Sequence, residues 1–208
     1  MKPYTQAPPF YAQWGEDRWL ATHFHVPGRG VFVDVGAGDG ERGSNTLYVE
    51  NLGWWGLCVD ADPRNHLPLR QRRRCAVETC AVARTRGPAA FGMYADKPSW
   101  SGLQCRGPGY RQVALDCQTL GSLLDRWRIG EVDLLSIDVE GTELEVWDSF
   151  DANRHRPAIV IVEFDDARAD RSSDTIRAHL GRNAYYEVHR TPANLILHRA
   201  DQPWQRRS

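Results

Sequence analysis

Short apolar runs, many of them rich in β-branched residues, alternate along this chain with stretches in which apolar residues recur at helical spacing. The short runs predict strands at residues 31–35, 55–60, 75–82, 132–138, 157–164, 185–190 and 194–199. The helical spacing predicts helices within residues 11–20, 43–52, 63–74, 119–127, 141–150 and 172–180. Strands that alternate with helices form parallel sheets, so the pattern predicts a doubly wound α/β domain.

Two parts of the chain depart from this alternation. The connection between the last two predicted strands is too short for a crossover helix, so these strands must pair antiparallel. Residues 89–113 carry glycines and prolines between short apolar pieces, which predicts an inserted hairpin or flap. We therefore expect residues 1–208 to form one domain, with a helical lead at 1–28 and the flap at 89–113.

Composition narrows the function without naming it. The 208 residues carry a formal net charge of -1 and include no apolar run near the ~20 residues of a membrane span, so neither nucleic acid nor a membrane is expected as a partner. The five cysteines are odd in number and form no C-x-x-C pair, which argues against a disulfide framework and a zinc site. No secretory signal is apparent, and a cytoplasmic location is the simplest prediction.

The first predicted strand leads into a glycine-rich turn, Val31-Phe-Val-Asp-Val-Gly-Ala-Gly-Asp-Gly40. Such turns bring the backbone close to a nucleoside or phosphate at the start of the next helix. The dinucleotide pattern G-x-G-x-x-G would need a glycine where this chain has Glu41, which disfavours a nicotinamide-dependent oxidoreductase. A binding module without catalytic activity stays open as an alternative.

The turn resembles motif I of class I S-adenosylmethionine-dependent methyltransferases. Other parts of the chain carry further motifs, which are Gln13-x-x-Glu16-Asp17, Ser44-Asn45-Thr46, Gly53-Trp54-Trp55-Gly56 with Asp60-Ala-Asp-Pro63, and Ile137-Asp-Val-Glu-Gly141. Together with the turn from Asp34 to Gly40, these motifs resemble those of the FkbM family. The resemblance implies a seven-stranded class I methyltransferase sheet of order 3-2-1-4-5-7-6, with strand seven antiparallel. It also implies S-adenosylmethionine as the cofactor.

On this interpretation, Asp60 at the end of the second strand accepts the ribose hydroxyls, and Ala81 and Val82 pack against the adenine. Gln13 and Asp17 fold over the methionine tail. Asp60 could instead cap the helix that begins at Pro63, and the other positions could be ordinary core or surface. The complete predicted cofactor set is Gln13, Asp17, Asp34, Gly36, Ala37, Gly38, Gly40, Ser44, Asp60, Ala61, Ala81 and Val82.

Asp138, Glu140 and Glu163 are the candidate catalytic carboxylates, because they stand at or near the ends of the fourth and fifth strands. Glu140 could instead cap the next helix, and Glu163 could pair with an arginine. The sequence after Asp138 lacks the Pro-Pro-aromatic element of many enzymes that methylate nucleobase amino groups. Because O-methylation of natural products and saccharides is common in the FkbM family, the resemblance implies an oxygen acceptor on a small molecule, natural product or sugar, bound under the flap at 89–113. The missing element favours the same acceptor, and a nitrogen acceptor is the alternative.

Two mechanisms remain open for removing the acceptor's proton. Asp138 and Glu163, with Glu140 or Asp165, could hold Mg²⁺, which would lower the pKa of the acceptor hydroxyl. In a metal-free site one carboxylate would act as the base, while the others would orient groups by hydrogen bonds. The sequence does not predict an oligomeric state.

Overall fold

The computed structural model describes residues 9–201 of the chain. The α-helices are α1 Glu16–His23, α2 Leu47–Asn51, α3 Pro63–Arg72, α4 Leu120–Arg126, α5 Glu143–Trp147, α6 Ala152–His155 and α7 Ser173–Gly181, with short 3-10 turns η1 Pro98–Trp100 and η2 Ala169–Arg171. The strands are β1 Val31–Val35, β2 Trp55–Val59, β3 Ala76–Glu78, β4 Ala81–Val82, β5 Gly87–Tyr94, β6 Tyr110–Gln118, β7 Leu134–Ile137, β8 Ile159–Glu163, β9 Tyr185–Arg190 and β10 Asn194–Arg199.

Seven strands form one sheet in the order β3-β2-β1-β7-β8-β10-β9. Counted along the sheet-forming strands alone, this is the predicted order 3-2-1-4-5-7-6, and β10 runs antiparallel to both β8 and β9. Asp34 of β1 lies level with Cys58 of β2 and with Ser136 of β7. The predicted sheet and its one reversed strand are therefore confirmed.

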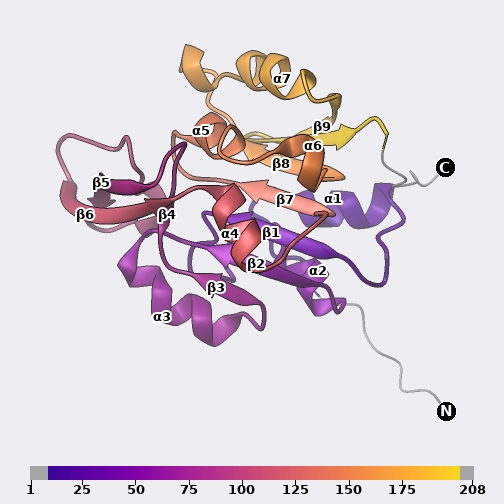
Figure 1. Ribbon diagram of the computed structural model, residues 1–208, viewed down its shortest axis with the longest axis horizontal. Helices are drawn as coiled ribbons and strands as arrows, with labels where there is room; N and C mark the ends of the chain where they lie inside the picture. Colours follow the sequence, from indigo (N-terminus) through magenta and orange to yellow (C-terminus); the bar gives the residue numbers. More distant parts are fainter. Residues whose placement is uncertain (1–8, 202–208) are drawn as a thin grey trace.

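Helices cover both faces of this sheet because successive residues of its buried strands point to opposite sides. Phe32 of β1 packs with residues of α1, α2 and α3, whereas its neighbour Val33 packs with α4, α5, α6 and α7. Figure 1 shows α3 beside β3 at one edge of the sheet and α7 beside β9 at the other. The result is a three-layer arrangement with a hydrophobic core on each face of the sheet.

The prediction of a single third strand at residues 75–82 is wrong, because this segment forms two strands. Ala76–Glu78 forms β3 beside β2, but Ala81–Val82 forms β4, which pairs with β6 in a separate three-stranded sheet of order β4-β6-β5. An apolar run carries no signal for a change of partner strand, so periodicity could not reveal the break. Strands β5 and β6 form a long antiparallel hairpin that contains the segment 89–113 and lies at one end of the molecule (Figure 1).

Several helices are shorter than their patterns predicted, for local reasons. In the 43–52 segment the Ser44 hydroxyl accepts hydrogen bonds from the backbone N–H groups of Thr46 and Leu47, so a turn precedes the helix, which starts at Leu47. The 141–150 segment is helical only from Glu143 to Trp147. Helix α6, which the sequence did not predict, begins where Asp151 accepts two backbone hydrogen bonds.

No helix within residues 9–201 has the length and hydrophobicity that crossing a membrane requires. The expected cytoplasmic location stays a prediction.

Candidate active site

A cavity of about 370 Å³ opens where the parallel strands β1, β2, β7 and β8 reach their carboxyl ends. Ligands of doubly wound sheets bind at this edge, beside the point where the strand order reverses. Most of the residues predicted for the site line the cavity. They are Gln13, Asp34, Gly36, Ala37, Gly38, Ser44, Asp60, Ala61, Ala81, Val82, Asp138, Glu140 and Glu163.

The glycine-rich turn after β1 lies against the ends of two neighbouring strands. Gly36 has a φ of 87° and packs so closely on the residue after β7 that a Cβ atom there would lie 1.6 Å from the carbonyl oxygen of Asp138. Gly38, with φ of 56°, is different, because a Cβ atom there would meet nothing within 4 Å. Gly36 thus serves the packing of the sheet, while Gly38 leaves open space for a ligand.

The carboxylate of Asp60 links this turn to the loop that follows β2. Its Oδ2 accepts a hydrogen bond from the Gly38 N–H at 2.8 Å, and its Oδ1 accepts from the Asp62 N–H at 2.9 Å and from Asn65 Nδ2 at 3.0 Å. Burial raises the pKa of Asp60 to about 7, although these three donors oppose the shift. The helix that starts at Pro63 is capped by Asp62 rather than Asp60.

Asp34 lines the cavity but belongs to a buried polar network. Its Oδ2 accepts a hydrogen bond from the Thr46 hydroxyl at 2.6 Å and lies 3.7 Å from Nη1 of Arg73. The fully buried Arg73 guanidinium is paired with Glu50 and also donates to the hydroxyls of Ser44 and Thr46. Burial raises the pKa of Asp34, and Arg73 acts in the opposite direction.

Two predicted cofactor residues fall outside the cavity lining. Asp17 is buried, and its carboxylate accepts hydrogen bonds from the backbone N–H groups of Tyr11, Ala12 and Arg18, which fixes the start of α1. Gly40 packs against α3, since a Cβ atom there would lie 2.9 Å from side-chain carbons of Leu69 and Arg73. Asp17 thus orders the start of α1 and Gly40 packs on α3, while their roles at the cofactor stay predictions.

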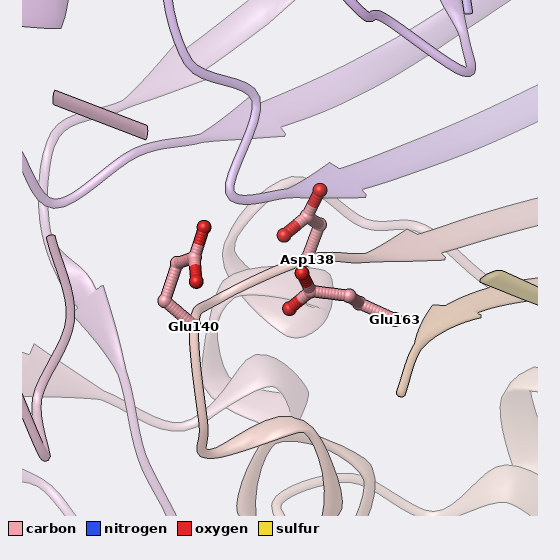
Figure 2. A group of neighbouring side chains, drawn as sticks. All are labelled: Asp138, Glu140 and Glu163. Carbon is pink, nitrogen blue, oxygen red and sulfur yellow. The ribbon is translucent and has the colours of Figure 1, made fainter. Parts of the chain in front are cut away.

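Asp138, Glu140 and Glu163 bring their carboxyl groups together at the edge of the cavity (Figure 2). Asp138 follows β7, Glu163 ends β8, and Glu140 lies in the turn before α5. One oxygen atom from each residue lies within 4.8 Å of the others. Glu140 has a φ of 60°, a left-handed conformation that is costly for a residue with a side chain.

Burial, followed by the crowding of negative charge, sets the electrostatics of this cluster. Burial and the neighbouring carboxylates raise the pKa of Asp138 well above its ordinary value. Burial and Glu163 raise the pKa of Glu140 to about 8, against the opposing effect of Arg171. Carboxyl groups in such surroundings hold a proton at a pH where ordinary ones have lost it.

Arg171 faces the cluster with its positive charge, and no local sequence pattern pointed to this residue. Its Nη2 donates to Glu163 and also to Glu143 Oε1, the latter at 3.1 Å. The alternative that Glu163 pairs with an arginine is therefore correct as a contact. The alternative that Glu140 caps the next helix is wrong, because α5 begins at Glu143 and has Thr142 at its N-cap position.

Three convergent carboxylates also suit a hard divalent cation in ligand type. Mg²⁺ prefers oxygen ligands and keeps several water molecules, so three carboxylate oxygens would suffice. Arg171, however, already supplies positive charge to Glu163. The donor set thus fits Mg²⁺, although Glu163 already has a cationic partner.

Sequence reasoning predicted the flap at 89–113 but did not name the individual residues of the flap, or of other segments, that line the cavity. Residues 98–101 and Leu103, from the connection between β5 and β6, line the cavity, as do Trp14, Arg42, Asn65 and Asn194. Trp14 and Trp100 keep 48% and 45% of their surface exposed. Asn45, which also lines the cavity, stands in a motif of the FkbM resemblance and could have been included on that signal.

Comparison with known proteins agrees with this geometry. The family model of the methyltransferase FkbM domain matches residues 34–188. A search of curated proteins found no match. Among solved structures, the chain resembles a precorrin-6Y C5,15-methyltransferase from Geobacter metallireducens GS-15, with 12% identity, a TM-score of 0.51 and coverage of 88% of this chain and 85% of that one.

A TehB-like SAM-dependent methyltransferase from Corynebacterium glutamicum ATCC 13032 Kitasato also matches, with 13% identity, a TM-score of 0.43 and coverage of 90% of this chain and 88% of that one. The likeness to the Geobacter protein shows a shared fold. The family match goes further, since it runs from Asp34 in β1 to Val188 in β9 and so takes in the glycine turn, Asp60 and all three carboxylates of the cluster. The chain therefore belongs to the FkbM family of S-adenosylmethionine-dependent methyltransferases.

Proposed function

We propose that this methyltransferase transfers the methyl group to a hydroxyl group on a small molecule or sugar. The observation that carries the proposal is the cluster of Asp138, Glu140 and Glu163 beside the cavity, with one oxygen of each within 4.8 Å of the others. An alcohol holds its proton tightly, so its methylation needs a proton acceptor close to the reacting oxygen. Once it has lost its own proton, a carboxylate with a raised pKa is a stronger base than an ordinary one.

The cofactor, when bound, supplies a methyl group that its sulfonium already activates. We place its nucleoside along the Gly36–Gly38 turn, its ribose at Asp60 and its adenine beside Ala81 and Val82. The open space at Gly38 and the buried acceptor oxygens of Asp60 support this placement. A cofactor bound there would share the cavity with Asp138 and Glu163, which also line it.

The protein's task in the transfer is to position the acceptor and take its proton. One carboxylate of the cluster accepts the hydroxyl proton as the acceptor oxygen bonds to the methyl carbon and the carbon–sulfur bond breaks. The products are a methyl ether, S-adenosylhomocysteine and a proton that passes from the carboxyl group to solvent. Because Arg171 pairs with Glu163, it lowers the free-energy cost of a negative charge on this carboxylate.

The opening of the cavity supports an acceptor that contains a ring. The cavity volume of about 370 Å³ lies at the low end of the ~300–1,000 Å³ range of ligand pockets. A bound cofactor would fill most of this volume, so the acceptor would bind near the opening. Trp14 and Trp100 present flat apolar surface there. Lys97 covers the Trp100 ring, with its Nζ atom 3.9 Å from the ring centroid. A sugar ring can pack its C–H face on such an indole.

The first experiment identifies the acceptor and the atom that is methylated. The pure protein is incubated with radiolabelled S-adenosylmethionine and a panel of glycosides, phenols, monohydric alcohols and amines. We expect labelled methyl ethers, which resist conditions that hydrolyse methyl esters and lack the basicity of methylamines. Labelled methylamines as the sole products would replace the proposal with its nitrogen-acceptor alternative.

A second experiment tests the carboxylate cluster. Asp138→Asn keeps the side-chain shape but removes a carboxyl group that can accept a proton when it is ionised, so we expect kcat to fall at least ~100-fold while the Kd for S-adenosylhomocysteine stays within about twofold. Glu145→Gln is the matched control, because Glu145 is a carboxylate of α5 whose Oε1 binds Gln104 outside the cavity lining. Near-normal kcat in Asp138→Asn would remove Asp138 from the mechanism.

Mg²⁺ is the second candidate for activating the acceptor. Asp138, Glu163 and Glu140 would hold it, and it would lower the pKa of a bound hydroxyl. Activity is measured after chelation and again as Mg²⁺ or Mn²⁺ is returned. Full activity in excess chelator favours the metal-free base, whereas loss and recovery of activity with the metal would establish the cation.

A further inference from the structure

Arg64 stands in the first turn of α3, directly after the loop that carries Asp60. Asp62, the N-cap of this helix, accepts hydrogen bonds at Oδ1 from the backbone N and from Nε of Arg64, at 2.9 and 3.0 Å. The Nη2 atom reaches the other oxygen, Oδ2, at 2.6 Å. Asp62 thus holds the guanidinium by a two-oxygen contact, which fixes its plane.

The other edge of the guanidinium binds residues 94–102, which run from the last residue of β5 into the β5–β6 connection. We call this segment the strap. Nη1 of Arg64 donates to the carbonyl oxygens of Tyr94 and Ala95, at 2.7 and 2.8 Å, and Nη2 lies 3.2 Å from the Ser101 hydroxyl. The same hydroxyl accepts from the Tyr94 N–H at 3.0 Å. Arg64 therefore joins both ends of the strap to the loop after β2.

The end of the strap packs on the turn that carries the carboxylates. A Cβ atom on Gly102 would lie 2.9 Å from the Val139 carbonyl oxygen and 3.2 Å from that of Glu140. Residues 98–101 of the strap line the cavity between these two attachments. The strap therefore forms a wall that runs from the Asp60 loop to the carboxylate cluster.

We propose that Arg64 is a positioning residue that couples occupancy of the cofactor site to the order of the strap, an inference that rests on the proposed function. The link is continuous, since Asp60 accepts from the Asp62 N–H, Asp62 holds Arg64, and Arg64 holds the strap. A ligand bound to Asp60 restrains this loop and, through Arg64, the wall beside the acceptor. Lysine cannot replace the planar fork that reaches both partners.

Hydrogen exchange measured by mass spectrometry, with and without S-adenosylhomocysteine, tests the coupling without an acceptor. In the wild type we expect the ligand to slow exchange of peptides covering residues 94–102 by about fivefold or more, within the usual range of coupling between sites. In Arg64→Ala the ligand still binds, but the slowing at the strap falls below about twofold. Arg64→Lys, which keeps the charge, gives the same loss or a partial one.

Arg106→Ala is the matched control, because Arg106 donates to the carbonyl oxygens of Cys105 and Ala90 within the same hairpin. We expect the ligand to slow exchange at its strap as in the wild type. Circular dichroism checks the fold of each variant, and Arg64→Lys carries the test if Arg64→Ala unfolds. A merely structural role would speed exchange at the strap equally in free and bound protein.

The outcomes separate the two ideas. If the wild-type strap does not respond to bound S-adenosylhomocysteine, or if the ligand slows exchange at the strap in both Arg64 variants as much as in the wild type, the coupling through Arg64 is wrong and the proposed reaction stands. If the wild type does not bind S-adenosylhomocysteine at all, the proposed cofactor site is wrong and the coupling falls with it. A nitrogen acceptor would overturn the proposed function and leave the coupling intact.

Discussion

At the residue scale, similar residues near the cavity have different physical roles. Gly36 is needed because the strand ends approach each other, whereas Gly38 leaves its Cβ direction empty beside the cavity. Asp17 satisfies backbone donors at a helix start, whereas Asp60 keeps its carboxylate at the cavity with a pKa of about 7. Two substitution experiments separate these roles.

Gly38→Ala adds one methyl group to the open space of the cavity. We expect the Kd for S-adenosylhomocysteine to rise at least about tenfold, and the left-handed backbone to cost ~1–2 kcal/mol in the free energy of unfolding. Gly53→Ala is the matched control, since Gly53 also has a positive φ and an empty Cβ direction but does not line the cavity. It should lose stability and keep affinity. Wild-type affinity in Gly38→Ala, measured by calorimetric titration, would contradict the placement.

The raised pKa of Asp60 predicts a pH-dependent cofactor affinity. At a pH below the Asp60 pKa of about 7, the free protein holds this carboxyl group protonated. The proton must leave before both oxygens can accept hydrogen bonds from the ribose. The Kd for S-adenosylhomocysteine should therefore fall as pH rises from 5.5 to 7, by up to about tenfold per unit, and level off above about pH 8. Titration calorimetry across this range measures it. Asp60→Asn should bind more weakly with a flat profile, and an equally steep profile in that variant would assign the proton to another group.

At the element scale, buried ion pairs fix how helices meet beside the site. Glu50 of α2 pairs with Arg73 at the end of α3, and it also accepts from the backbone N–H groups of Arg74 and Cys75. Arg171 pairs with both Glu143 of α5 and Glu163 of β8, and so joins these two elements. Such pairs cost desolvation energy but are strongly destabilising when only one partner is removed.

Glu50→Gln should therefore lower the free energy of unfolding by about 3 kcal/mol or more, because Arg73 stays buried with its charge only partly balanced by Asp34. Urea denaturation monitored by tryptophan fluorescence measures the loss. In the control Asp174→Ala, the pair with Arg177 is exposed, and less than about 1 kcal/mol should be lost. Equal losses in both variants would show that the buried Glu50–Arg73 pair contributes no more to stability than the exposed Asp174–Arg177 pair.

At the scale of the whole molecule, we propose that residues 1–208 form a single cooperative domain. Val82 of the smaller sheet belongs to the same hydrophobic cluster as Val33 and Leu57 of the large sheet. The strap also packs on the turn after β7, and Arg64 holds it to α3. The smaller sheet and its strap thus contact the rest of the protein through the hydrophobic cluster, through the turn after β7 and through α3.

Scanning calorimetry tests this proposal. We expect one unfolding transition whose calorimetric and van't Hoff enthalpies agree within error. Saturating S-adenosylhomocysteine should raise the temperature of the whole transition, because the ligand binds only the folded protein. Two separate transitions, of which the ligand moves one, would show that the hairpin sheet unfolds on its own.

Much of the site could be predicted because its residues stand at strand ends. A run such as residues 132–138 shows its own direction and end, and parallel strands place their carboxyl ends along one edge. This is why Asp60, Asp138 and Glu163 were found together before the structure was known. Asp17 and Gly40 also stood near strand or helix ends, but their packing partners were not readable from the sequence.

The sequence by itself determined the alternation of strands and helices, the reversed last strand, the glycine turn and the acids that follow the strands. All of these depend on local period and chain direction, which neighbouring residues encode. The tertiary structure alone decided that Val82 changes sheets, that Arg171 faces Glu163, and that Arg64 joins the strap to the Asp60 loop. Those contacts join residues from separate elements, and no local pattern specifies which distant element will become a neighbour.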